Sequence, residues 1–128
     1  MELLRYDPLE HIDSDAWQEL DESERKQLVV RYHRREQIRL PNETAHALIH
    51  VMVENQLALG DAYPVKAVLA RLMNEGLDRH EAIHAIGTVL SETFFNAMHG
   101  EEIDGDLNAR YLEKLKILSA ESWRKQML

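Results

Sequence analysis

The sequence predicts an all-α protein, a bundle of four or five principal helices joined by short connections. Apolar residues recur at helical spacing through most of the chain, and no segment shows the alternation of a half-buried strand. Residues typical of helix starts and stops separate these stretches, namely Asp21, Asn42, Gly60, Gly76 and Asp78. A chain of 128 residues is long enough for one hydrophobic core, so we expect a single helical domain over 1–128.

Residues 1–20 are expected to fold back onto the body as an N-terminal arm or short helix, through Tyr6, Leu9, Ile12, Trp17 and Leu20. The first long helix should begin at Asp21, because Asp21 and Glu24 have the spacing of a capping box. It should run to about Ile38 and end before Pro41, since the residue before a proline disfavours helical backbone.

The second helix should follow the N-cap Asn42 and stop at Gly60. It is apolar on most sides, which predicts a central, buried position. A third helix should open near Asp61, with Pro64 in its first turn, and end at Gly76.

The fourth helix should begin at Asp78, which forms a second capping box with Glu81, and should run to about Met98. Gly87 and Ser91 lie on one of its faces and would let another backbone come close. Together, residues 40–100 make a motif-bearing core. Residues 101–128 form a C-terminal helical segment, with a helix from about Leu107 to Leu118 and a last turn carrying Trp123.

Four histidines occur as two pairs at the same spacing, His46 with His50 and His80 with His84. Residues four apart lie on one face of a helix, so each pair offers two imidazoles side by side. If short connections make neighbouring helices antiparallel, the helices carrying the pairs run parallel and both pairs reach the same end of the bundle. We therefore expect the two pairs to meet.

Two such pairs supply the four nitrogen ligands of a transition-metal site. The sequence predicts one divalent transition metal held by His46, His50, His80 and His84. The chain has no cysteine, so zinc is the default for imidazole ligation, with iron, nickel or copper as alternatives. Candidates for an extra ligand, or for groups that orient the ligands, are His33, Glu36, Glu54 and Glu81.

The segment His80-Glu81-Ala82-Ile83-His84 also matches the HExxH pattern of zinc proteases. A zinc protease requires a third metal ligand, and Glu101 and Glu102 lie at a conceivable distance along the chain. It also requires a strand edge to hold the peptide substrate, and no strand is evident. Glu81 has a simpler role as the capping carboxylate. Di-iron carboxylate bundles use Glu-x-x-His on two helices, and that pairing is absent, so one metal is favoured over two.

Charge and composition restrict the classes of partner. The net charge of −8 argues against broad nucleic-acid binding, and no apolar run is long enough to span a membrane. No secretory signal is evident, so a cytoplasmic location is expected. Four arginines at the end of the first long helix form a solvated face or an anion-recognising rim: Arg31, Arg34, Arg35 and Arg39.

Within the segment from Leu40 to Met98, the distinctive residues are Asn42, the HALIH sequence at 46–50, Glu54 to Leu57 and the run from Gly76 to His84. This segment, roughly the middle half of the chain, resembles a family of small bacterial proteins known only as a domain of unknown function. The family brings no assigned activity. The resemblance implies that the two histidine pairs belong together.

Three functions remain open from the sequence. The favoured one is a metal-binding bundle in which the metal has a structural or regulatory role. The second is a metal-dependent enzyme, hydrolytic or oxidative, with an open coordination position. The third is a metal-free module that binds a protein partner. A homo-oligomer is also plausible, because helices that are apolar on most sides need cover.

Overall fold

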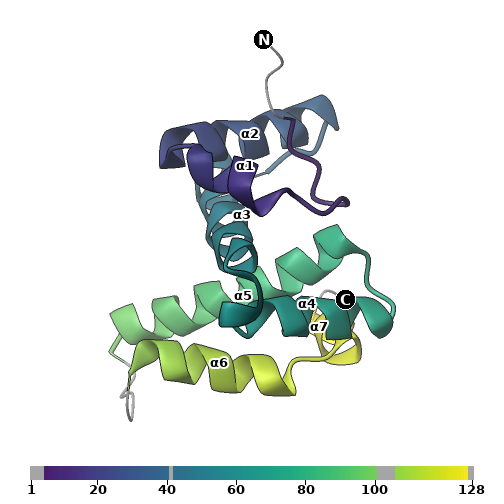
Figure 1. Ribbon diagram of the computed structural model, residues 1–128. Coiled ribbons are helices and arrows are strands. Elements are labelled where there is room, and N and C mark those ends of the chain that lie inside the picture. Colours follow the sequence, from purple (N-terminus) through teal and green to yellow (C-terminus); the bar gives the residue numbers. More distant parts are fainter. Residues whose placement is uncertain (1–4, 41, 101–105, 127–128) are drawn as a thin grey trace.

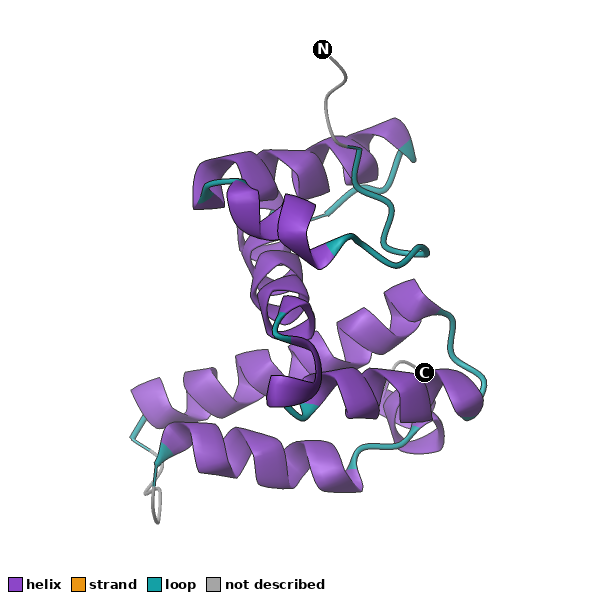
Figure 2. Ribbon diagram, viewed as in Figure 1, coloured by secondary structure: helices purple, strands orange, loops and turns teal. Residues whose placement is uncertain are grey.

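The computed structural model describes residues 5–40, 42–100 and 106–126, and within these ranges it contains helices and no strand (Figures 1 and 2). This confirms the predicted all-α class. None of these helices is long and apolar enough to cross a membrane. The elements are α1 (Ser14–Glu19), α2 (Glu22–Arg35), α3 (Glu43–Ala58), a 3₁₀ turn η1 (Gly60–Ala62), α4 (Val65–Asn74), α5 (Arg79–Met98), α6 (Leu107–Ile117) and α7 (Ala120–Gln126).

The three predicted caps start their helices as expected. Asp21 accepts a hydrogen bond from the backbone N–H of Glu24 at 2.8 Å, and Glu24 accepts one in return from Asp21. The same reciprocal pair joins Asp78 and Glu81, at 2.7 and 3.0 Å. Asn42 accepts from the backbone of α3 at 3.0 Å. Each cap satisfies backbone donors that the first turn of a helix leaves free.

Two helix boundaries differ from the prediction. Helix α2 ends at Arg35, three residues before Ile38, because Gln37 adopts a φ of 58° and the Ile38 N–H bonds back to His33 O at 2.8 Å. A helix was also expected to open near Asp61. Instead the chain makes the turn η1, and α4 begins only at Val65, after Pro64.

Helix α3 lies at the centre, with α1 and α2 packed on it in one part of the molecule and α4 and α5 in another (Figure 1). The expectation that the two histidine-bearing helices run parallel is wrong, because Figure 1 shows α5 running across α3. Close approach at Gly87 accompanies this crossing. A Cβ atom added there would lie 2.6 Å from Cγ2 of Ile49 on α3, so the close approach at Gly87 is made by a side chain and not by a backbone as expected.

The buried apolar residues form two cores. The N-terminal core is built on α1, α2 and the first half of α3, and it comprises Tyr6, Trp17, Leu28, Val29, Tyr32, Ala47 and Val51. The C-terminal core is larger and mostly aliphatic, and it includes Val53, Val65, Leu72, Ile83, Ile86, Leu90 and Leu115. Of the residues expected to fold back onto the body, Tyr6 and Trp17 are buried in the N-terminal core and Ile12 and Leu20 pack against it, whereas Leu9 is 52% exposed.

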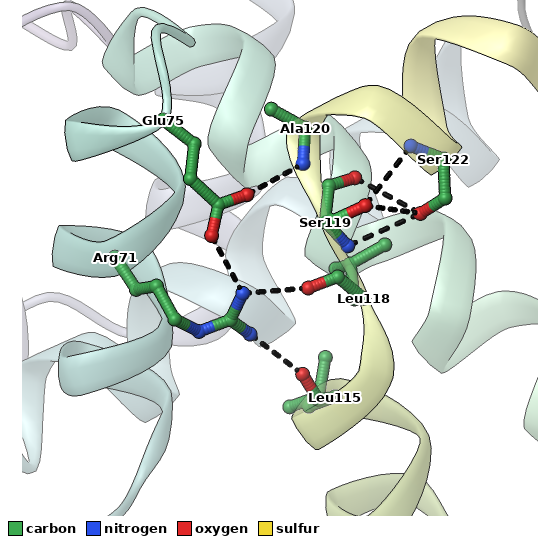
Figure 3. Close-up of polar contacts among 7 residues, drawn as sticks. All are labelled: Arg71, Glu75, Leu115, Leu118, Ser119, Ala120 and Ser122. Atoms are coloured by element: carbon green, nitrogen blue, oxygen red, sulfur yellow. Dashed lines mark hydrogen bonds and ion pairs between the residues drawn. The ribbon is translucent and has the colours of Figure 1, made fainter.

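The corner between α6 and α7 is fixed to α4 by polar contacts (Figure 3). Arg71 on α4 donates to the carbonyl oxygens of Leu115 and Leu118, at 2.9 and 2.7 Å. Its neighbour Glu75 accepts from the backbone N–H of Ala120 at 2.8 Å. Arg71 thus bonds to carbonyl groups at the end of α6 and Glu75 to a backbone N–H at the start of α7, so the two C-terminal helices are fixed to α4.

Candidate metal centre

Five of the seven histidines meet at one place, brought there by three helices. His33 comes from α2, His46 and His50 from α3, and His80 and His84 from α5. His50 is at the middle of the group, since the ring centroids of the other four lie 4.8 to 5.1 Å from its own. The two predicted pairs are therefore together, and His33 joins them.

Four of these residues offer nitrogen atoms that all lie within 4.8 Å of one another: His33, His50, His80 and His84. Ligands of a tetrahedral zinc ion are separated by about 3.3–3.4 Å, given zinc–nitrogen bonds of about 2.0–2.1 Å. Two nitrogen pairs are near that separation already. The Nε2 atoms of His33 and His46 are 3.2 Å apart, and those of His50 and His84 are 2.9 Å apart. The remaining nitrogens of the group of four lie within 4.8 Å of one another, farther apart than the ligands of a tetrahedral ion.

The tautomer of His33 is fixed by the backbone of its own helix. Its Nδ1 atom lies 2.9 Å from the carbonyl oxygen of Val29, which can only accept a hydrogen bond. The proton of the neutral ring is therefore on Nδ1, and the lone pair on Nε2 is directed toward the cluster. A histidine whose outer nitrogen donates to a carbonyl is the usual arrangement of a metal ligand.

His50 is fixed in the same sense by Tyr6. The Tyr6 hydroxyl donates to Oε2 of Glu54 at 2.7 Å, and it also lies 2.9 Å from Nδ1 of His50. Because the hydroxyl proton goes to the carboxylate, the tyrosine oxygen accepts from His50 Nδ1–H. The Nε2 lone pair of His50 is then left facing His84.

Behind Tyr6 stands a buried ion pair between Glu54 and Arg79, whose side chains are 2% and 6% exposed. Arg79 contacts both carboxylate oxygens, at 2.8 and 3.0 Å, and also donates to the carbonyl oxygen of Pro8. Bidentate hydrogen bonding of this kind stabilises an ion pair that is buried away from water. Burial, followed by the charge of Glu54, raises the pKa of Tyr6 well above its usual range, so this hydroxyl keeps its proton.

The imidazoles are held in the neutral form that a metal requires. Burial lowers the pKa of His46, His80 and His84 to about 4, and the neighbouring histidines add to the effect. For His50, burial and then the same neighbours lower the pKa further still. Burial also lowers the pKa of His33. Only unprotonated imidazole nitrogen binds a metal, so the cluster is ready to bind at neutral pH.

His80 carries a buried nitrogen, Nε2, that has no hydrogen-bond partner among the residues that the structure describes. An unpaired polar atom in an interior costs about 1–3 kcal/mol. The atom belongs to the group of four whose nitrogens converge. A cation bound there would satisfy it.

The other predicted candidates have different positions. Glu54 does not touch an imidazole directly, but reaches His50 through Tyr6. Glu81 is occupied in the cap of α5. Glu36 is exposed at the end of α2. In the arginine cluster, Arg34 pairs with Glu43 at 2.8 Å, and Arg35 donates to the backbone oxygen of Tyr6.

Tyr6 and Arg79 are the residues of the site that the sequence reasoning did not assign. Arg79 directly precedes His80, so its place at the start of α5 was a signal, but nothing in the sequence pairs it with Glu54. Tyr6 was expected only as an apolar contact of the arm. Its hydroxyl lies 44 residues away in sequence from the ring it contacts.

A surface groove of about 410 Å³ reaches the cluster at the crossing of α3 and α5. Its lining includes His46, His50 and His84, together with Glu92 and Trp123. Three of the imidazoles therefore border space that solvent and small molecules can enter.

Comparisons with known proteins found no relative: the chain matches no protein-family model, no curated protein and no solved structure. The interpretation of the site therefore depends on its own geometry.

Proposed function

We propose that the protein binds one divalent transition metal, zinc by default, through the imidazoles of its histidine cluster. The metal would connect α2, α3 and α5 and so have a structural or regulatory role. The identity of the metal follows from the donors: neutral nitrogen ligands without a thiolate suit zinc, while iron, nickel and copper share the preference for imidazole.

The observation that carries this proposal is the direction of the outer hydrogen bonds. Nδ1 of His33 donates to Val29 O and Nδ1 of His50 donates to Tyr6, so both rings are locked with their Nε2 lone pairs inward. A hydrogen-bonded histidine core without a metal would need each inward nitrogen to meet an N–H group. The neighbouring rings of His46 and His84 can supply one to His33 and to His50, so the discriminating atom is on His80. The unpaired Nε2 of His80 does not fit that alternative.

His50, His80 and His84 are common to the predicted ligand set and to the group of converging nitrogens. We propose these three as ligands, with the fourth position taken by His33 or His46, whose Nε2 atoms are 3.2 Å apart. Separate alanine variants of His33 and His46 distinguish the two, because loss of a direct ligand lowers metal affinity far more than loss of a neighbour. If either substitution alone leaves the affinity unchanged, that residue is not a ligand.

The test is metal content on protein purified without an affinity tag, before and after chelation, with the melting temperature read on both samples. We expect one equivalent of metal, and chelation should lower the melting temperature by about 10 °C if the free metal stands near 100 times its dissociation constant. His84→Ala should lose the metal, whereas His99→Ala, outside the cluster, should keep it.

Near-zero metal in both the wild-type protein and His84→Ala, together with failure of the apoprotein to bind added zinc, would overturn the proposal. The histidines would then be a hydrogen-bonded core, and a metal-free interaction module would be the better interpretation. Stoichiometric iron or copper in place of zinc would keep the site but point to redox or oxygen chemistry.

A metal-dependent enzyme is the second candidate, and the groove beside His46, His50 and His84 favours it. A catalytic metal keeps a coordination position for water or substrate, which must be reachable from outside. Glu92 lines the same groove and is the available acid or base there. Absorption spectra of the cobalt-substituted protein test this, because a fifth, exchangeable ligand changes the spectrum on addition of azide and a closed four-histidine site does not respond.

A further inference from the structure

A second cavity, of about 190 Å³, is bordered by Glu54 and Arg79, the ion pair that supports Tyr6 and through it His50. It is formed between the N-terminal arm, the end of α3 and the exposed stripe of α4. Its walls are mostly apolar, and Ile12, Trp17, Leu57 and Leu69 contribute to them. None of these residues belongs to the histidine cluster, so the cavity is a separate feature.

The size of the cavity suits one small ring. An engineered apolar cavity of about 150 Å³ in another protein binds benzene, so a space somewhat larger accepts a ring with a small polar substituent. The lining includes Trp17, a large aromatic residue of which only 1% is exposed. Exposed His11 and Lys66 border the cavity where it meets solvent.

The charges around the cavity favour an anion. Both oxygens of Glu54 accept hydrogen bonds, from Tyr6 and from Arg79, and the charge of this carboxylate is neutralised by Arg79. Lys66 remains. Its only ion-pair partner in the described part of the chain is Asp61 at 3.4 Å, and the Asp61 side chain is 96% exposed, so this contact is weak.

We propose that this cavity binds a small apolar monoanion, with its hydrocarbon body against Trp17, Leu57 and Leu69 and its charge beside Lys66. An aromatic carboxylate of the size of benzoate has this chemistry. The cavity also borders Glu54 and Arg79, which support Tyr6 and through it His50. Nevertheless, binding of the anion does not depend on the metal.

The experiment titrates benzoate into the protein and follows backbone amide resonances, with both the protein as purified and the chelated protein. Benzamide and benzylamine serve as the neutral and cationic probes of the same shape. We expect saturable shifts at Ile12, Trp17 and Leu69 with benzoate, and at least tenfold weaker binding of the other two probes. Because the chelated sample is measured as well, failure of the metal proposal does not decide this result.

Two variants test the assigned roles. Lys66→Gln should weaken benzoate binding about tenfold, whereas Lys116→Gln, an exposed lysine on α6 away from the cavity, should not change it. Ala58→Leu places a larger side chain in the cavity wall and should abolish binding. If Ala58→Leu does not fold, Lys66→Gln still decides, since it changes an exposed position.

Absence of saturable benzoate binding would overturn the proposal. So would equal affinity for benzamide, or unchanged affinity in Lys66→Gln, because either result would remove the role of the charge.

Discussion

The two cores of this protein are built on different principles. In the N-terminal core, large aromatic residues are connected to polar groups: Trp17 Nε1–H donates to Asn55, and Tyr6 donates to Glu54. The C-terminal core is mostly aliphatic, with residues such as Leu72, Ile83 and Ile86, and its Tyr111 is the aromatic residue that donates to a polar group, Gln56, at 2.6 Å. The histidines lie between the cores, with His33 on the side of the first and His80 and His84 on the helix that carries much of the second.

This difference indicates which part of the molecule depends on the site. Apolar packing stabilises a core whatever the state of the histidines, whereas buried polar groups are stable only while each one has its partner. The N-terminal core shares Tyr6 with the site, and α2 contributes His33. We therefore expect the N-terminal core to respond to protons, metal and nearby mutations more strongly than the C-terminal core.

Acidification of the metal-free protein should produce the largest difference in stability between the two cores. An unfolded histidine titrates near pH 6.5, whereas burial lowers the pKa of His46, His80 and His84 to about 4 in the folded protein. Between these values the unfolded chain binds more protons, so the free energy of unfolding should fall as the pH falls from about 6.5 to about 4. Urea denaturation at a series of pH values measures this.

Hydrogen exchange at pH 5 shows which part of the protein loses stability. We expect the amides of α2 to exchange before those of α6. His99→Ala should leave the slope unchanged, because His99 lies outside the cluster. A denaturation midpoint that stays constant between pH 7 and pH 5 would contradict the assignment of neutral, buried histidines.

Truncation of one buried residue in each core gives the next largest effect. Trp17 and Leu115 are each 1% exposed, and their replacement by alanine should cost about 3–5 and about 2–5 kcal/mol respectively. Only Trp17→Ala should also weaken metal binding, because Trp17 packs against Tyr6, with ring centroids 6.0 Å apart. Chemical denaturation and calorimetric metal titration measure the two quantities, and equal metal affinities in the two variants would disprove the asymmetry.

Gly87→Ala tests the close approach of α3 and α5. The added Cβ would meet Cγ2 of Ile49 at 2.6 Å, so the helices must move apart, at a cost of about 1–3 kcal/mol. Since Ile49 lies between His46 and His50 on the sequence, metal affinity should fall as well. Adding Ile49→Ala removes the colliding atom and should restore much of the affinity. A fully stable single variant would show that the helices are not in tight contact there.

Tyr6→Phe should have the smallest effect on stability and the most selective one on the site. It keeps the ring in the N-terminal core but removes the oxygen that accepts from His50 Nδ1. Loss of such an outer hydrogen bond typically lowers metal affinity by 10- to 100-fold, and we expect about tenfold. Tyr32→Phe in the same core is the matched control. Equal metal affinity in wild type and Tyr6→Phe would remove Tyr6 from the site.

Much of the fold could be predicted, because helix starts are local features. The capping boxes at Asp21 and Asp78 and the cap at Asn42 depend on residues no more than three apart, and all three are found where the sequence places them. The crossing of α3 and α5 could not be predicted in this way. It depends on how the Ile49 side chain packs against the backbone at Gly87, whereas short connections between helices predict only that neighbouring helices run in opposite directions.

The gathering of the histidines was predictable to a similar degree. The spacing of the histidine pairs placed His46 with His50 and His80 with His84 on single helix faces, and the structure brings the two pairs together with His33. The groups that orient the rings come from distant segments. Tyr6 is 48 residues from Glu54, and Arg79 is 25 residues from it, so no local pattern indicates either contact.

The positions of the histidines along the chain also set the order in which the site can be completed. A ribosome releases the chain from its N-terminus, so His33, His46 and His50 emerge well before His80 and His84 on α5. The first three could hold an ion only incompletely. Full coordination requires α5 to have reached α3, and a metal captured at that moment would secure the early helices before α6 and α7 are added.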